Sequence, residues 1–297
     1  MKTVPFSSQY LSPLTALVNG HIAAVPPCWA LCESQVAAAL AAPEPWARHY
    51  PENAGPVESE TLCVAEDDLL AAAQLTFADG AAVIGWIVAY PGARPALRRL
   101  LDEIRERARR HGCHTLTLAR YAFGVGWLGI PLAWPHLTGG LQEAGFVPSK
   151  QWVLMAGPTD VPPVVQPPEP AGLRLAWRHD PVASEWQVEA CVHAARVADC
   201  DAWAIPPYFE GCPGFRQWVT VEWVGVEQPY HRRGIGCWML GEHLRYLSRQ
   251  GFRQAILWTE TTNLPMQGLA EKAGFKRGPV CQEFSAIRLE NPPEETG

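Results

Sequence analysis

The chain has 297 residues, 48% of them hydrophobic, and a formal net charge of −6 at pH 7. This length predicts two domains with sizeable cores, and the acidic balance gives no reason to expect nucleic acid or an anionic membrane as a partner. The nine cysteines are scattered without metal-finger spacing, and no signal peptide or membrane-spanning apolar run is found, so we expect a cytoplasmic protein with reduced thiols and no metal site.

The first third of the chain predicts two short helices followed by strands. Residues 9–24 and 34–40 have helical patterns, and Ser34 is the predicted N-cap of the second helix. Three strand-like runs follow at 61–66, 69–77 and 81–90. Asp79 and Gly80 join the last two runs, and an Asp-Gly pair is a strong signal for a hairpin turn.

An amphipathic helix is predicted next, with Pro95 in its first turn. Its apolar residues recur at the spacing of one helix face: Leu97, Leu100, Leu101, Ile104 and Ala108. Gly112 ends this helix, and residues 113–118 predict a strand. An aromatic loop at 121–136 then leads through a short helix to a strand at 151–155.

Six prolines in residues 157–172 predict a stiff linker. The second half of the chain again alternates strands and helices. Strand-like runs lie at 173–177, 188–194, 197–205, 217–226 and 254–259. A helical pattern separates the last two runs, so they are expected to be parallel neighbours joined by a right-handed crossover.

The most informative stretch is the loop that follows the strand at 217–226. Tyr230-His-Arg-Arg-Gly-Ile-Gly236 is short and basic, and a helical pattern starts at its end. Two glycines let backbone N–H groups approach a ligand, while Arg232, Arg233 and the helix dipole add positive charge. The loop therefore predicts a pyrophosphate site, although it matches neither GxGxxG nor GxxxxGK[ST].

This loop resembles the acetyl-CoA motif of the GNAT superfamily of N-acetyltransferases, (Arg/Gln)-x-x-Gly-x-(Gly/Ala), with His231 as a departure at the first position. Thr262-Asn263 and Leu269-Ala-Glu-Lys-Ala-Gly-Phe275 extend the resemblance. It implies that residues 231–236 (His231, Arg232, Arg233, Gly234, Ile235, Gly236) bind the pyrophosphate of acetyl-CoA. It further implies that Trp223, Val224, Gly225 and Val226 offer backbone groups to pantetheine, while Asn263 either reaches the cofactor or caps the following helix.

Two series of elements in the chain resemble each other. Residues 109–118 parallel 248–257, and 137–146 parallel 265–275, in the same order of helix, glycine and strand. The predicted fold is therefore α/β, with two tandem GNAT-like domains, each a mixed, mostly antiparallel sheet flanked by helices. We expect a degenerate domain at 1–156, the linker, and an acyl-CoA-binding domain at 173–297. The first domain has Tyr90-Pro-Gly-Ala-Arg-Pro95 where the second has its loop, and its two prolines remove N–H donors.

The catalytic residues are less clearly marked than the cofactor loop. The amine must lose a proton, and Glu222 is the predicted base on the central strand, with Asp201 a weaker candidate that suits a hairpin turn. Ala270 occupies the position where the resembled family usually has a tyrosine acid. Tyr230 or Tyr208 substitutes for it, or solvent suffices.

Other reactive residues are given structural roles. Cys237 is expected to be a small packed residue, and His193 and His243 lie in apolar contexts without the spacing of metal ligands. Trp127 and Trp134, in the aromatic loop, are predicted to contact the acceptor.

The predicted function is transfer of an acetyl or other acyl group from acetyl-CoA, as co-substrate, to an amine of a small molecule or peptide. The alternative is an inactive acyl-CoA sensor or scaffold, which Ala270 and His231 favour. The intact Arg-Arg-Gly-Ile-Gly run and Glu222 favour the enzyme. Neither the acceptor nor the oligomeric state is indicated by the sequence.

Overall fold

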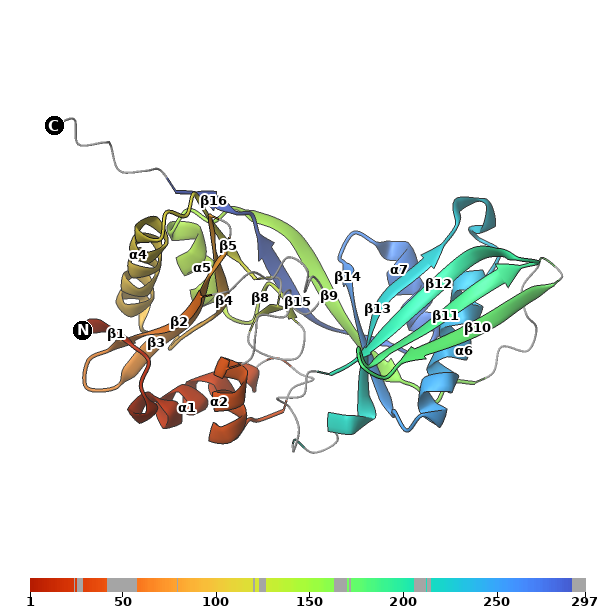
Figure 1. Cartoon of the computed structure of the whole chain (residues 1–297), viewed down its shortest axis with the longest axis horizontal. Helices are drawn as coiled ribbons and strands as arrows, with labels where there is room; N and C mark the ends of the chain where they lie inside the picture. Colours follow the sequence, from red (N-terminus) through yellow and green to blue (C-terminus); the bar gives the residue numbers. More distant parts are fainter. Residues whose placement is uncertain are drawn as a thin grey trace. The chain divides into compact units, whose positions relative to one another are not determined.

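The computed structural model of the chain divides into two compact units (Figure 1). It describes residues 1–23, 25, 29–41, 58–78, 80–119, 121–122, 127–162, 170, 172–205, 212 and 215–289. Unit 1 comprises Met1–Trp152 and Pro279–Gly297, and unit 2 comprises Val153–Gly278. Residues 279–289, which the sequence places in the second domain, thus group with unit 1, while the domain boundaries at 156 and 173 stay a prediction.

Unit 1 contains a six-stranded sheet in the order β1-β2-β3-β4-β5-β16. Its strands are β1 (Lys2–Pro5), β2 (Glu58–Ala65), β3 (Leu69–Ala78), β4 (Ala81–Ala89), β5 (Thr115–Leu118) and β16 (Ile287–Arg288). β4 and β5 are parallel, and the other pairs for which a register is resolved, such as β3 with β4, are antiparallel. Gly80, in the predicted hairpin turn, has a φ of 74°, which is a conformation that glycine adopts easily, whereas Asp79 lies outside the described residues.

The sheet of unit 1 lies between two sets of helices (Figure 1). α4 (Arg94–Arg110) contacts β2, β3 and β4 and also packs on α5 (Pro135–Glu143), whereas α1 (Leu11–Ile22) contacts β3 and β4. The five apolar residues predicted for one face of α4 are all buried. Because helices cover both faces, the central strands are apolar on both sides.

Two details of unit 1 differ from expectation. Ser34 lies inside α2 (Glu33–Ala41), and the side chain of Gln35 instead accepts a hydrogen bond from the backbone N–H of Cys32 at 2.9 Å. Trp134 is only 3% exposed, and its Nε1 donates to the carbonyl of His21 at 3.1 Å. Trp134 is therefore a core residue, which contradicts its predicted contact with the acceptor, and the side chain of Trp127 lies outside the described residues.

Short strands complete unit 1. They are β6 (Tyr121–Ala122), which pairs with β7 (Trp127–Leu128), and β8 (Ile130–Pro131), which pairs with β15 (Lys276–Phe284) through Cys281 and Gln282. The first residues of β9 (Pro148–Pro158) are tied to this part of β15, since Nε1 of Trp152 donates to Glu283 at 2.8 Å.

Unit 2 has the strand order β10-β11-β12-β13-β14-β9. The strands are β10 (Leu173–Asp180), β11 (Glu185–Val192), β12 (Ala195–Ala204), β13 (Trp218–Val226) and β14 (Gln254–Glu260), together with residues of β9. β10 to β13 are antiparallel neighbours, and β13 is parallel to β14 as predicted. The helix α6 (Ile235–Arg249) connects these two parallel strands, and α7 (Leu264–Lys272) follows β14.

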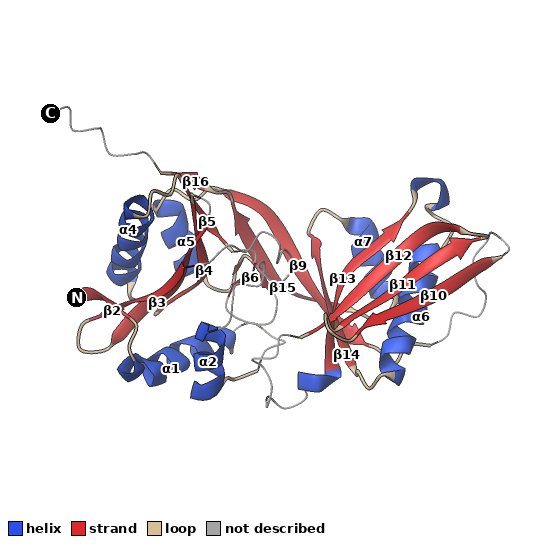
Figure 2. Ribbon diagram, viewed as in Figure 1, coloured by secondary structure: helices blue, strands red, loops and turns tan. Residues whose placement is uncertain are grey.

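α6 packs on β11, β12 and β13 (Figures 1 and 2). Along β12 the buried residues Ala198, Cys200 and Ala202 alternate with the half-buried residues Asp199 and Asp201. Since side chains of a strand point alternately to its two sides, the buried set faces α6 and the acidic set lies on the opposite face. Unit 2 thus has one apolar face, under α6, and one polar face.

The predicted linker at 157–172 is partly packed structure. Thr159 is fully buried, and its Oγ1 donates to the carbonyl of Phe252 at 2.7 Å. The carbonyl of Pro162 accepts a hydrogen bond from Arg245 at 2.9 Å. Residues 157–162 are therefore not a free linker, and 163–169 and 171 lie outside the described residues.

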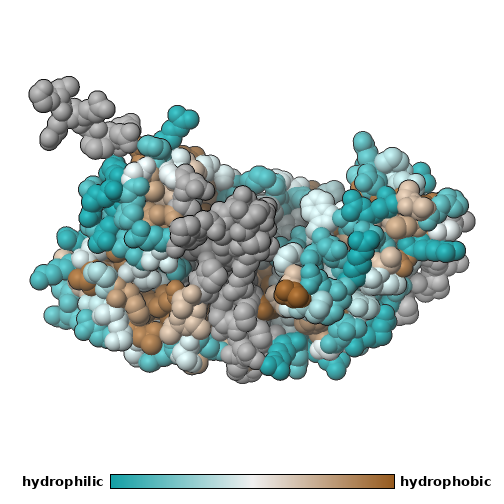
Figure 3. Space-filling model, viewed as in Figure 1, coloured by the Kyte–Doolittle hydropathy of each residue, from teal (hydrophilic) through white to brown (hydrophobic). Residues whose placement is uncertain are grey.

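The surface agrees with this arrangement of layers. On the face that Figure 3 shows, hydrophilic residues cover α4, and hydrophobic residues gather around α1. Of the helices in the described part of the chain, none is both long and apolar enough to span a membrane.

Candidate functional site

The parallel pairing of β13 with β14 stops half-way along β13. It joins Trp218–Val221 to Gln254–Leu257. At the same point the antiparallel register with β12 shifts: Val221 pairs with Ala202 and Trp223 with Asp201, so Glu222 is an extra residue in β13. Such a bulge bends a strand and increases its twist. Past the bulge, β13 leaves the ladder with β14.

The loop after β13 has the backbone of an anion site. Arg232 has a φ of 60° and Gly234 a φ of 80°, and α6 begins at the next residue, Ile235. Alternating left-handed residues turn successive N–H groups toward one side, and the first N–H groups of a helix have no carbonyl partner within the helix. Gly236 is packed closely, because a Cβ there would lie 3.0 Å from Leu269 and 3.2 Å from Val226. The loop therefore fits the predicted diphosphate through its backbone.

Two side chains of this loop are engaged within it. Nε2 of His231 donates a hydrogen bond to the carbonyl of Val226 at 2.7 Å, which ties the loop to the last residue of β13. The guanidinium of Arg233 lies 5.5 Å from the ring centre of Tyr230, in the short 3₁₀ helix η5 (Gln228–Tyr230). Tyr230 is thus at the loop, four residues beyond the end of β13, and not at the bulge.

The residues after β14 have structural contacts. Oδ1 of Asn263 accepts a hydrogen bond from the backbone N–H of Met266 at 3.2 Å, so Asn263 is the N-cap of α7. Ala270 is completely buried. A methyl group in the interior therefore occupies the position at which the resembled family has a tyrosine.

The position of Asp201 makes it a stronger candidate for the proton acceptor than the sequence indicated. The sequence predicted Asp201 in a turn, but the residue lies inside β12 on the polar face of unit 2. It is the register partner of Trp223, beside the bulge. Burial, together with the negative charges of Glu185 and Asp199, raises the pKa of the Asp201 carboxyl to about 6. Glu222, the predicted base, is exposed at the bulge itself.

Two histidines and a tyrosine remain among the polar residues that the sequence analysis considers. His193 has a φ of 56° in the turn between β11 and β12. His243 is fully buried on α6, and burial lowers the pKa of its imidazole to about 4. Tyr208, the second candidate acid, lies outside the described residues.

Unit 1 has the same strand frame with a different loop. Its counterpart of the glycine loop is a tight turn in which the N–H of Ala93 bonds to the carbonyl of Tyr90 at 2.9 Å, directly before α4. Nε2 of His136 donates to the carbonyl of Ala89, the last residue of β4, at 2.9 Å. A turn and the side chain of His136 therefore lie at the end of β4, at the place where unit 2 has its glycine loop.

Comparison with known proteins agrees with this geometry. Residues 173–275, all within unit 2, match the Acetyltransferase (GNAT) family. Residues 173–275 therefore form a GNAT-like domain within the chain. Members of this family transfer acyl groups, and unit 2 is referred to below as the GNAT domain. None of the curated proteins matches the chain in sequence.

Solved structures extend the likeness of fold to the whole chain. A tandem GNAT protein from the clavulanic acid biosynthesis pathway has a TM-score of 0.60 at 16% identity and covers 98% of this chain and 99% of its own. A GCN5-related N-acetyltransferase from Sphaerobacter thermophilus has a TM-score of 0.58 at 14% identity, over 98% and 96% of the two chains. The glucosamine N-acetyltransferase region of a fungal multi-domain β-N-acetylglucosaminidase has a TM-score of 0.65 at 12% identity, over 96% of this chain and 38% of that one. The predicted tandem GNAT fold is confirmed.

Proposed function

We propose that the GNAT domain transfers the acetyl group of acetyl-CoA to an amine by direct attack. One observation carries this proposal: β13 leaves β14 at the Glu222 bulge and then leads into a loop whose left-handed residues precede the first turn of α6. This arrangement supports an extended ligand that has an anionic end at the loop and a reactive end near the bulge.

The proposed cofactor contacts follow the order of the chain. Backbone N–H groups of residues 231–236 bind the diphosphate, and Arg232 and Arg233 add charge-assisted hydrogen bonds. Backbone groups of Val224–Val226 pair with the pantetheine arm. His231 acts by holding the loop against β13, since its Nε2 is engaged with the carbonyl of Val226. Asn263 contributes by capping α7.

The proposed reaction needs a group that accepts a proton from the amine. The acceptor ammonium loses one proton, its lone pair forms the C–N bond to the acetyl carbon as the C–S bond breaks, and the thiolate of coenzyme A takes up a proton. Glu222 at the bulge and Asp201 beside it are the two proposed proton acceptors. Ala270 supplies no acid, and Tyr230 lies at the loop, so we propose that solvent protonates the thiolate.

Turnover of acetyl-CoA with a panel of primary amines tests the proposal, together with thermal unfolding in the presence of acetyl-CoA. Ligand at about a hundredfold above its Kd adds ~2.7 kcal/mol to the free energy of unfolding, so the midpoint should rise by several degrees. Stabilisation with turnover supports the enzyme. Stabilisation without turnover of any amine would instead indicate an acyl-CoA-binding scaffold. No stabilisation by acetyl-CoA would contradict both the enzyme and the scaffold.

A further inference from the structure

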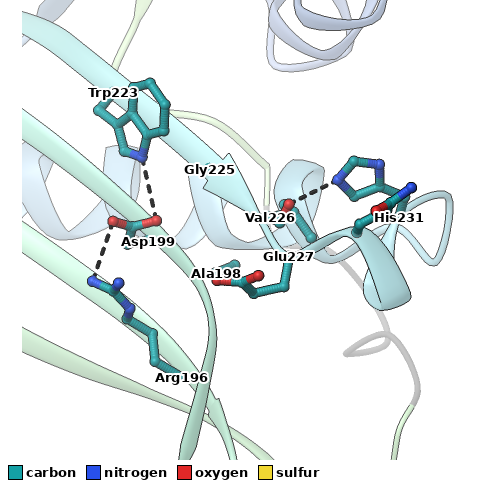
Figure 4. A pocket seen from close by; sticks show the side chains of 9 residues that line it. Arg196, Ala198, Asp199, Trp223, Gly225, Val226, Glu227 and His231 are labelled. Atoms are coloured by element: carbon teal, nitrogen blue, oxygen red, sulfur yellow. Dashed lines mark hydrogen bonds and ion pairs between the residues drawn. The ribbon is translucent and has the colours of Figure 1, made fainter.

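The GNAT domain has a cavity on its polar face beside the proposed cofactor loop (Figure 4). Its volume is about 640 Å³, and residues of β12, β13 and the following loop line it. Trp223 forms one wall and is 56% exposed. A large indole in the middle of a strand usually contributes to a core, so its exposure at a cavity indicates a surface that a ligand covers.

The indole of Trp223 is held in one orientation. Its Nε1 donates a hydrogen bond to Oδ1 of Asp199 at 3.3 Å, and Oδ2 of Asp199 lies 3.5 Å from Nη1 of Arg196 (Figure 4). Gly225 makes this contact possible, since a Cβ there would lie 2.6 Å from Nε1 and 2.8 Å from Oδ1. The ring is thus positioned before any ligand binds, which lowers the entropy cost of binding.

The chemistry of the cavity suits a cation. The face of an indole attracts positive charge. Asp199 and Glu227 place two carboxylates in the lining, and the positive charge of Arg196 is paired with Asp199. His231 contributes an imidazole whose Nε2 is already bonded to the carbonyl of Val226.

The cation in this cavity is not the nitrogen that reacts. An attacking amine must be neutral, whereas an indole face and carboxylates hold an ammonium in its charged form. The cavity also extends from Trp223 past Gly225 to the loop, away from the Glu222 bulge. The indole of Trp223 reaches along β13 as far as Gly225, three residues beyond Glu222. Since strands advance ~3.3 Å per residue, the ring and the bulge are on the order of 5–10 Å apart.

We propose that Trp223 and Asp199 form a subsite for a second positive charge of the acceptor, so that the acceptor class is a diamine. This inference rests on the proposed acetyl transfer by the GNAT domain. One nitrogen of the diamine loses its proton and is acetylated near the bulge, and the other remains an ammonium over the indole throughout the reaction.

Steady-state kinetics with putrescine and n-butylamine tests the subsite, because these probes have the same carbon chain and differ in the second ammonium. We expect a higher kcat/KM for putrescine in the wild type. Trp223→Ala should lower kcat/KM for putrescine by about 3- to 30-fold, mainly through KM, and leave the values for n-butylamine and the KM for acetyl-CoA unchanged. Trp223→Phe, which keeps an aromatic face, should retain part of the preference.

A second variant tests whether misfolding, and not loss of the subsite, explains a reduced kcat/KM in Trp223→Ala. Asp199→Ala leaves the indole in the chain but removes the carboxylate that holds it, and it should lose the putrescine preference to about the same extent as Trp223→Ala. Equal kcat/KM for the two amines in the wild type would overturn the inference, as would a higher KM for acetyl-CoA in Trp223→Ala. Failure of the proposed function is distinct, because it appears as no acetylation of either amine in the wild type.

Discussion

The two units of this chain share one strand frame and differ in what is attached to it. In unit 1 the ladder of β4 with β5 ends at Ile84, and the register with β3 shifts so that Gly85 is the extra residue. In unit 2 the ladder of β13 with β14 ends at Val221, and Glu222 is the extra residue. The frame is therefore common to both, and a carboxylate is present at only one of the two bulges.

The same registers align the residues around each bulge. Trp86 pairs with Gln74 in unit 1, and Trp223 pairs with Asp201 in unit 2. Trp86 is only 4% exposed, whereas Trp223 is 56% exposed. Val88 occupies the position that corresponds to Gly225.

Trp86 and Trp223 differ in exposure because helices cover both faces of the sheet in unit 1 and one face in unit 2. In unit 1, α1 and α4 contact the central strands, and both faces of β4 are buried. In unit 2, α6 covers one face, and acidic residues of β12 lie on the other. The strand frame is therefore common to both units, while the polar face, the bulge carboxylate and the glycine loop mark the unit that is proposed to react.

The largest effect is expected from Gly234→Asp in the loop. The substitution adds a negative charge at the proposed diphosphate site and strains a residue at a φ of 80°. Affinity for acetyl-CoA should fall at least about 100-fold, or ~2.7 kcal/mol, by isothermal titration calorimetry. Gly251→Asp is the matched control, since Gly251 has a φ of 102° and open space around it. A similar loss of acetyl-CoA affinity in Gly251→Asp would mean that backbone strain, and not the charge at the loop, causes the loss in Gly234→Asp.

A large effect on turnover is expected from Glu222→Gln. If Glu222 accepts the proton of the amine, kcat should fall by about 100- to 10,000-fold while the KM for acetyl-CoA stays within about twofold. Glu189→Gln, on the neighbouring part of the polar face, should change kcat little. An unchanged kcat in Glu222→Gln would leave Asp201 as the proposed proton acceptor.

A gain in stability is expected from Asp201→Asn, with a loss of activity. Burial and the charges of Glu185, Asp199 and Glu189 raise the pKa of Asp201, against the lowering effect of Arg196. The charged form is therefore penalised in the folded state above about pH 6 and the penalty disappears below about pH 4. The variant should be more stable by about 1–3 kcal/mol at pH 8 and equally stable at pH 4 in urea unfolding. A gain of the same size at both pH values would contradict this cause.

The smallest effect is expected from Trp134→Phe in unit 1. The change removes the hydrogen bond from Nε1 to the carbonyl of His21 and should cost about 1 kcal/mol of stability. Acetyl-CoA affinity and the selectivity among amines should not change. A shift in that selectivity would restore the acceptor role that burial of Trp134 contradicts.

Local patterns predicted the elements of the fold well. The apolar spacing on α4, the hairpin turn at Gly80 and the strand-loop-helix series from β13 to α6 each depend on residues close in sequence, so they are visible without a structure. The repeat of this series also predicted the tandem arrangement.

Features that depend on distant residues were not predicted. β16 pairs with β5 through residues about 170 positions apart, and no local pattern marks such a partner, so the sequence analysis did not predict this pairing. Asp201 was expected in a turn because Asp is a common turn residue, and its place on an open face depends on the packing of α6 elsewhere. The contact of Trp223 with Asp199 over Gly225 requires the register of two strands.

The measurement that tests the central claim most directly is the stoichiometry of acetyl-CoA binding to the wild-type chain by isothermal titration calorimetry. One acetyl-CoA should bind per chain, at the loop before α6. Two per chain would contradict the inferred difference between the units, and none would contradict the proposed cofactor site.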